Sequence, residues 1–175
     1  METDHLILRR PRIEDLDDFL AYRNAPESLK FQSIASISED AAVSFLEKQE
    51  KIEPETAFGW IMFSIELKSE SRMIGEVGIF IPEGGVQGDI GWSLQSRYQG
   101  RGHASEASRE LLNYAFAVRK LHRLTANCDA NNRASVRIME KLGMRREGHF
   151  VKSQMRDGEW IDCYTYAILR EEWPA

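Results

Sequence analysis

The stretch Ser96–Ala107, SRYQGRGHASEA, decides the fold of this chain. It follows Asp89–Leu94, a run typical of a strand, and leads into a segment whose apolar residues recur at helical spacing. The first amides of a helix lack partners within the helix and lie at the positive end of its dipole, so they bind anions. Gly100 and Gly102 let a backbone approach an anion without a Cβ in the way. The stretch therefore predicts a strand, a glycine turn and a helix that together hold a diphosphate.

Further strands and helices are expected on both sides of this motif. Residues 24–37 carry the weakest signal, and we see neither an internal repeat nor a linker. The polar turns at 68–71 and 156–159 indicate two antiparallel hairpins. Asn132 is a suitable helix N-cap, and Gly143 can end that helix in a left-handed conformation. We expect strands near residues 6–8, 58–67, 73–81, 89–94, 124–128, 147–155 and 160–169, and helices near 13–24, 38–53, 104–118 and 132–143.

The composition of the chain limits the number of domains, the kind of partner and the location that we expect. The 175 residues, 42% of them hydrophobic, suit one domain spanning 1–175. With 23 Lys and Arg against 28 Asp and Glu, the net charge of -5 argues against nucleic acid and suits a cationic partner. Cys128 and Cys163, the only cysteines, lack metal-ligand spacing, and no apolar signal segment follows Met1. We therefore expect a cytoplasmic protein with no metal and no membrane span.

Three phosphate-binding motifs compete for the glycine turn. The P-loop is excluded because no Gly-Lys-Ser/Thr follows. The dinucleotide fingerprint needs a glycine or alanine where Ser105 stands and an acidic residue about twenty positions later, where the chain reads Lys120–Arg123. A third pattern, Gln/Arg-x-x-Gly-x-Gly/Ala between a strand and a helix, is met by Gln99, Gly102 and Ala104.

With this third pattern the sequence resembles the GNAT superfamily, the acyl-CoA-dependent N-acyltransferases. The resemblance covers nearly the full length, and the order and spacing of its motifs look like the branch containing the Rim-type N-terminal acetyltransferases of ribosomal proteins. The six-residue motif alone is weakly specific, but its combination with Asn-x-x-Ser before a helix ending in Lys-Leu-Gly is strong. The residues that carry the resemblance are Leu6–Arg9, Asp89–Trp92, Gln99–Ala104, Asn131–Ser135 and Glu140–Met144.

The resemblance implies an α+β, three-layer fold with one mixed, mostly antiparallel sheet of about seven strands, flanked by about four helices. The central strands are expected to splay around acetyl-CoA. Amides of the glycine turn then hold the pyrophosphate, the backbone of Leu94–Ser96 pairs with the pantetheine arm, and the Leu94 region supplies an amide near the thioester oxygen. The expected cofactor-binding residues are Leu94, Gln99, Gly100, Arg101, Gly102, His103, Ala104, Ser105 and Asn132.

Amine attack on the thioester needs a base, and two carboxylates are candidates. By analogy Asp89 matches the family's acidic position two residues before the glycine, and strand alternation places it on one face with Gly91 and Ser93. A solvated aspartate at a strand end is the alternative for Asp89. Glu76 is the rival base, because neighbouring apolar residues could raise its pKa, although an outward-facing glutamate is the more ordinary explanation.

Ser135 corresponds to the family serine that lies near the CoA sulfur, where its hydroxyl can protonate the departing thiolate; local helix capping is its alternative role. Asn132, expected to contact pantetheine, is also a good N-cap. Tyr164 or Tyr166 could replace Ser135 as the acid, although aromatic strand residues usually pack. Trp60, Trp92 and Trp160 are likewise expected to pack in the sheet, although one of them could line the acceptor pocket.

The side chains nearest the turn have ordinary explanations. His103 is expected to face solvent and to contribute its amide, and Glu106 complements the helix dipole. Arg97, Arg101 and Arg133 could face phosphates, but only Arg101 lies inside the motif.

The resulting hypothesis is an N-acetyltransferase that moves acetyl from acetyl-CoA to a primary amine by direct attack in a ternary complex. The acceptor, a protein N-terminus or a small molecule, has no readable signature. A catalytically silent acyl-CoA-binding regulatory module is the alternative, and a dinucleotide enzyme fits poorly. Either a monomer or a homodimer is compatible with the sequence.

Overall fold

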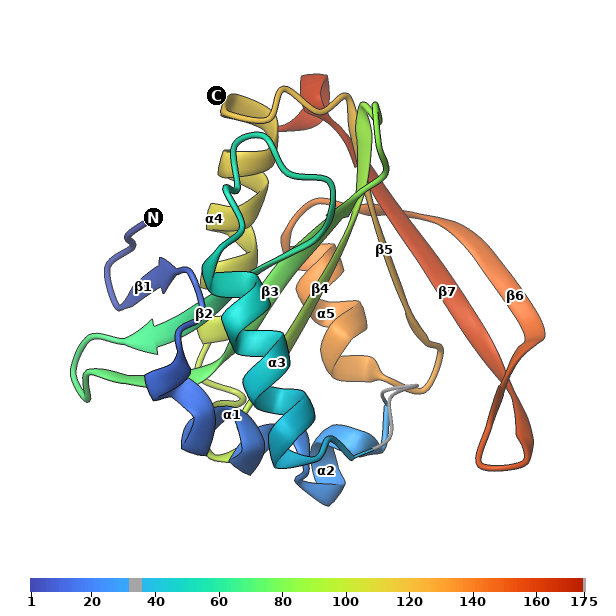
Figure 1. Cartoon of the computed structure of the whole chain (residues 1–175). Coiled ribbons are helices and arrows are strands. Elements are labelled where there is room, and N and C mark those ends of the chain that lie inside the picture. Colours follow the sequence, from blue (N-terminus) through green and yellow to red (C-terminus); the bar gives the residue numbers. More distant parts are fainter. Residues whose placement is uncertain (32–35, 175) are drawn as a thin grey trace.

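A single mixed sheet of seven strands, in the order β1-β2-β3-β4-β5-β7-β6, organises the computed structural model, which describes residues 1–31 and 36–174 (Figure 1). Neighbouring strands are antiparallel except β4 and β5, which run parallel. The mixed, mostly antiparallel sheet expected from the sequence is confirmed. The strands are β1 (Leu6–Arg9), β2 (Gly59–Leu67), β3 (Arg72–Ile81), β4 (Gln87–Leu94), β5 (Arg123–Asp129), β6 (Arg145–Arg156) and β7 (Glu159–Leu169).

Helices cover both faces of the sheet (Figure 1). Helices α1 to α3 pack on one face, and α4 and α5 pack on the other. The described residues form five α-helices against about four expected, because the single turn α2 arises in the stretch with the weakest signal; residues 32–35 of that stretch lie outside the described residues. The helices are α1 (Leu16–Arg23), α2 (Pro26–Leu29), α3 (Glu39–Glu50), α4 (His103–Ala117) and α5 (Arg133–Lys141), with short 3₁₀ turns at Ile13–Asp15, Ser96–Tyr98 and Arg170–Glu172.

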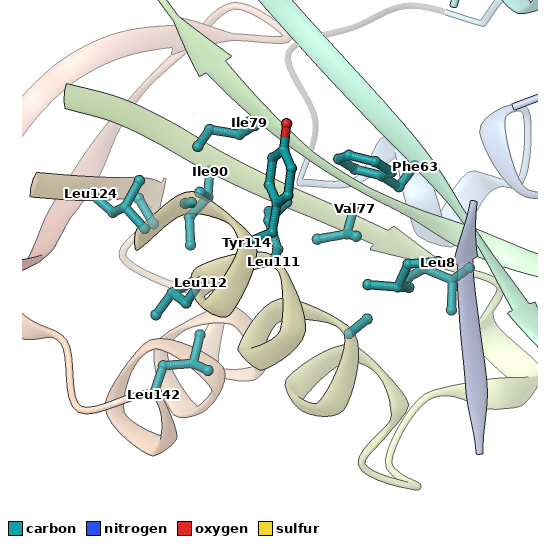
Figure 2. Packing of buried hydrophobic residues seen from close by; sticks show 14 of the residues in the cluster. Leu8, Phe63, Val77, Ile79, Ile90, Leu111, Leu112, Tyr114, Leu124 and Leu142 are labelled. Atoms are coloured by element: carbon teal, nitrogen blue, oxygen red, sulfur yellow. The ribbon is translucent and has the colours of Figure 1, made fainter. Parts of the chain in front are cut away.

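The main core lies between the sheet and the second helical layer. Figure 2 shows Leu111 and Leu112 of α4 directed at strand residues such as Val77 and Ile90. These side chains are at most 3% exposed, and burying a large apolar side chain stabilises a fold by about 1.5–3 kcal/mol. Packing of this layer fixes where α4 begins, and therefore where the glycine turn lies.

Strands β4 and β5 pair with each other only over their first three residues. Their register runs from Gln87 opposite Arg123 to Asp89 opposite Thr125, and no strand pairing follows. The two strands then separate toward their carboxyl ends, with α5 behind the opening (Figure 1). The expected splay of the central strands is therefore present.

Local sequence signals place the ends of several elements correctly. The Ser38 hydroxyl accepts from the Ala41 amide at the start of α3. Gly143 ends α5 with a φ of 76°. Asp157 and Gly158 both have positive φ in the turn between β6 and β7, as a two-residue hairpin requires. None of the helices in the described part of the chain is long and apolar enough to cross a membrane.

Candidate active site

The glycine turn leads into the first residues of α4. Gly102 is the N-cap with a φ of 93°, and Gly100 has a φ of 75°, a region that residues with a Cβ rarely adopt. A Cβ added at either position would find no atom within 4 Å, so the space in front of the turn is open. The amides of residues 103–105 begin a helix of 15 residues and have no partner four residues earlier in the helix. The turn is therefore shaped to receive an anion.

A cavity of about 610 Å³ connects this turn to the opening between β4 and β5. Its volume lies within the range of about 300–1,000 Å³ typical of small-molecule sites. From the turn and α4, Gln99, Gly100, Gly102, His103, Ala104 and Ser105 line the cavity, and Gly91–Leu94 line it from β4. The open cradle and the elongated opening fit an acyl-CoA diphosphate and its pantetheine arm.

The backbone of β4 presents only some of its amides to this opening. The Gln95 amide donates to the Ile74 carbonyl of β3 at 2.9 Å, so alternation directs the Leu94 amide away from β3 and toward the opening. The Leu94 carbonyl accepts from the Gln99 side chain at 2.9 Å. Within the expected stretch 94–96, Leu94 rather than Gln95 offers an amide to a ligand.

Two residues of the turn differ from expectation. Arg101 is exposed and is not among the residues that line the cavity, so only its backbone belongs to the turn. His103 is half-buried instead of solvent-facing, and its Nδ1 atom is buried without a hydrogen bond to any described residue. The cationic side chains that line the cavity are Arg137 and Lys141 of α5, together with Lys30. Arg137 and Lys141 lie four residues apart and therefore share one face of α5, which is a pattern that the sequence shows.

Asp89 lies at the edge of the cavity, where β4 and β5 begin to separate. Its Oδ1 atom accepts from Thr125 Oγ1 at 2.8 Å and from Asn127 Nδ2 at 3.1 Å, and its Oδ2 atom bonds to no described residue. Burial raises the pKa of Asp89 although both hydrogen bonds lower it. Asp89 itself does not line the cavity, but Asn127 and Gly91, the next residue on its face of β4, both do.

Glu76 occupies a different environment. Its side chain is 4% exposed and pairs with Arg23 of α1 at 2.7 Å. Burial raises the pKa of Glu76, while Arg23 and Tyr22 oppose the shift. Glu76 does not line the cavity. The outward-facing glutamate expected as the ordinary alternative is wrong, because α1 covers this face of the sheet.

The loop before α5 brings Asn132 and Ser135 to the cavity wall. Asn132 Oδ1 accepts from the Ser135 amide at 3.1 Å, so Asn132 performs the capping and the Ser135 hydroxyl is not required for it. Tyr164 and Tyr166 do not line the cavity. Tyr166 is 3% exposed and its hydroxyl bonds to Glu140, which identifies it as a packing residue.

Glu106 has a structural role in holding the N-terminal segment against α4. Its carboxylate accepts from Thr3 Oγ1 at 2.5 Å and from the His5 amide at 3.0 Å, and so ties the N-terminal segment to α4. Burial raises the pKa of Glu106, but these hydrogen bonds outweigh it and lower the pKa.

Part of the cavity wall is formed by residues without a sequence signal. Glu27, Ser28, Lys30 and Phe31, in and after α2, line it together with Cys128 of β5. The Arg156 guanidinium, at the end of β6, donates to the Lys30 and Phe31 carbonyls and pairs with Asp129. The two carbonyl contacts join elements more than a hundred residues apart, which explains why the sequence did not reveal them.

Comparison with known proteins agrees with this geometry. Residues 5–145 match the acetyltransferase (GNAT) domain family. The chain is 34% identical over 171 residues to the uncharacterized N-acetyltransferase YnaD of Bacillus subtilis, covering 98% of this chain and 97% of that protein. A GNAT-family acetyltransferase structure from Bacillus anthracis superposes with a TM-score of 0.88 at 32% identity, covering 98% of this chain and 99% of that one.

The Rim-type resemblance also finds a counterpart. The [ribosomal protein uS5]-alanine N-acetyltransferase of Escherichia coli is 29% identical over 84 residues, which cover 48% of this chain and 43% of that enzyme. The family match over most of the chain, the close relatives and the cavity at the start of α4 lead to one conclusion: the chain belongs to the GNAT family of acetyl-CoA-dependent N-acetyltransferases.

Proposed function

We propose that residues 1–175 act as one domain that transfers acetyl from acetyl-CoA to a primary amine, on a protein N-terminus or a small molecule, by direct attack in a ternary complex. The observation that carries the proposal is the continuity of the cavity. One space is lined by the anion-binding turn, by Gly91–Leu94 and by Glu27 and Ser28 of α2. Cosubstrate and acceptor can therefore meet beside β4 within one cavity.

Asp89 is the proposed base and Ser135 the proposed acid. The raised pKa of Asp89 strengthens it as a proton acceptor, and Oδ2 is free of hydrogen bonds to the described residues. The proton travels from the amine to this oxygen, directly or through one water. The Ser135 hydroxyl, spared from capping, donates to the departing thiolate. The Leu94 amide stabilises the oxyanion that amine attack creates.

The properties of Cys128 support direct attack of the amine on the thioester over a covalent acyl-enzyme. It lines the cavity, but burial raises the pKa of its thiol to about 11, with Asp129 and Cys163 adding to the shift. At neutral pH only about one thiol in ten thousand is ionised at that pKa, and the thiolate is the nucleophile. A covalent acyl-enzyme at Cys128 is therefore disfavoured, and Cys128→Ala is expected to retain turnover.

The test is thiol release from acetyl-CoA by the purified protein over a panel of amines. The panel includes straight-chain alkyl amines, polyamines and peptides beginning with Ser, Ala or Thr. We expect amine-dependent release with stoichiometric N-acetylation, measured by mass spectrometry. Tight CoA binding without release for any member would contradict the proposal and support the catalytically silent acyl-CoA-binding module.

A further inference from the structure

Two aromatic side chains stand exposed on an otherwise covered face of the sheet. Trp60 is 46% exposed and Phe80 is 38% exposed, whereas Ile61 and Ile79, which alternate with them, are at most 1% exposed. Trp60 and Phe80 are cross-strand partners on β2 and β3, and their ring centroids lie 5.7 Å apart. Together they form a continuous apolar surface, here called the aromatic wall.

The aromatic wall adjoins the proposed base. Phe80 lies opposite Asp89 in the pairing of β3 with β4, and Asp89 lies opposite Thr125 in the pairing of β4 with β5. One row across the sheet therefore reads Trp60, Phe80, Asp89, Thr125. Paired residues of neighbouring strands project from the same face, so the two rings and the carboxylate share one face.

The next row of the sheet leaves a hollow beside Trp60. Gly78 and Gly91 are paired there, and neither has a side chain. Met62 fills the space over Gly78, since a Cβ at that position would lie 2.2 Å from the Met62 sulfur. Over Gly91 the nearest atom to such a Cβ is Cη2 of Trp60, at 3.9 Å. Gly91 lines the cavity, whereas Trp60 and Phe80 do not, so the Trp60 ring lies beside the cavity wall at Gly91.

We propose that Trp60, supported by Phe80, is a specificity-determining residue that receives the apolar group next to the acceptor's amine, so that the enzyme prefers hydrophobic primary amines. The inference rests on the proposed transfer function. The acceptor arrives as a cation, and the Asp89 carboxylate and the two ring faces attract an ammonium group. The carbon chain beside that group loses contact with water against Trp60, whereas a hydroxyl or a second ammonium would lose hydration there.

The experiment measures kcat/KM with saturating acetyl-CoA for propylamine, butylamine, pentylamine and hexylamine, whose amino groups are equally basic. A fully buried methylene contributes about fourfold, so a methylene half covered by an open wall is expected to raise kcat/KM about twofold. The account predicts this rise in the wild type and an almost flat series in Trp60→Ala. In Trp60→Ala the loss of this dependence should appear as a higher KM for hexylamine, while KM for acetyl-CoA stays unchanged.

Two further variants separate specificity from folding. Trp60→Phe keeps a smaller ring and should restore part of the dependence on chain length. Trp160→Ala removes a tryptophan that is 58% exposed on β7 and pairs with Met155 of β6, far along the sheet from Asp89, and it should leave the series unchanged. An unaltered series in Trp60→Ala, or a flat series in an active wild type, would overturn this inference alone. Absence of thiol release with every amine would overturn the transfer function and the inference with it.

Discussion

The proposed chemistry depends at the residue scale on Asp89, and Asp89→Asn tests it. The amide keeps an oxygen for the hydrogen bonds from Thr125 and Asn127 but cannot take a proton. General base catalysis contributes about 10²- to 10⁴-fold, so we expect kcat to fall by at least about a hundredfold with the affinity for CoA retained. Isothermal titration and steady-state kinetics measure the two quantities.

The pH dependence of kcat tests the same role of Asp89. A base works only when deprotonated, so wild-type kcat rises with pH as Asp89 ionises, and its raised pKa places this rise above the range of an ordinary aspartate. Asp89→Asn should lose this acid limb. Undiminished rates across pH in the variant would remove Asp89 as the base.

Gly102 tests the anion cradle. Gly102→Glu places a negative charge and a side chain in the open space before the α4 amides. Juxtaposed like charges cost several kcal/mol, so CoA affinity should fall by at least about a hundredfold. Gly84→Glu is the matched control, because Gly84 also has a positive φ and open space but does not line the cavity. Equal affinity in the two variants would contradict an anion site at the turn.

Glu76 acts at the scale of elements, since its pair with Arg23 fastens α1 to β3. Removing one partner of a buried ion pair costs about 3–5 kcal/mol, and Glu76→Gln should lose this much free energy of unfolding in a denaturant titration. The variant should keep the acid limb of the pH profile. Glu147→Gln breaks a more exposed pair with Arg123 and should leave the free energy of unfolding almost unchanged, because solvent screens exposed pairs.

An opposite pattern would change the role of Glu76. If Glu76→Gln unfolds like the wild type but loses the acid limb, the buried carboxylate is the base and Asp89 is not. The two carboxylates are therefore distinguished by one pair of variants and two measurements.

Over the whole molecule, the sequence predicted what local backbone chemistry determines. The glycine turn, the Asn132 cap and the end of α5 at Gly143 follow from φ angles and unpaired amides within a few residues, and the structure has all three. The mixed, mostly antiparallel sheet and the splay of β4 and β5 also agree, because the apolar periods that define the elements are readable and the family resemblance implies the sheet and its splay.

The acceptor side was not readable for a physical reason. The proposed acceptor side draws on separate elements: α2, which lines the cavity, Arg156 at the end of β6, which bonds to the chain after α2, and the aromatic wall, which lies beside Gly91. Each of these has an ordinary local explanation, and only tertiary pairing brings them near the cavity. The side chains of Arg137 and Lys141, which replace Arg101 at the cavity, depend in the same way on how α5 packs.

The central claim is that the first amides of α4 bind the diphosphate of coenzyme A. A crystal structure of the protein with coenzyme A tests it most directly. The account predicts the diphosphate within hydrogen-bonding distance of the amides of residues 100–105, with pantetheine between β4 and β5. Coenzyme A bound elsewhere, with the glycine turn facing only solvent, would contradict it.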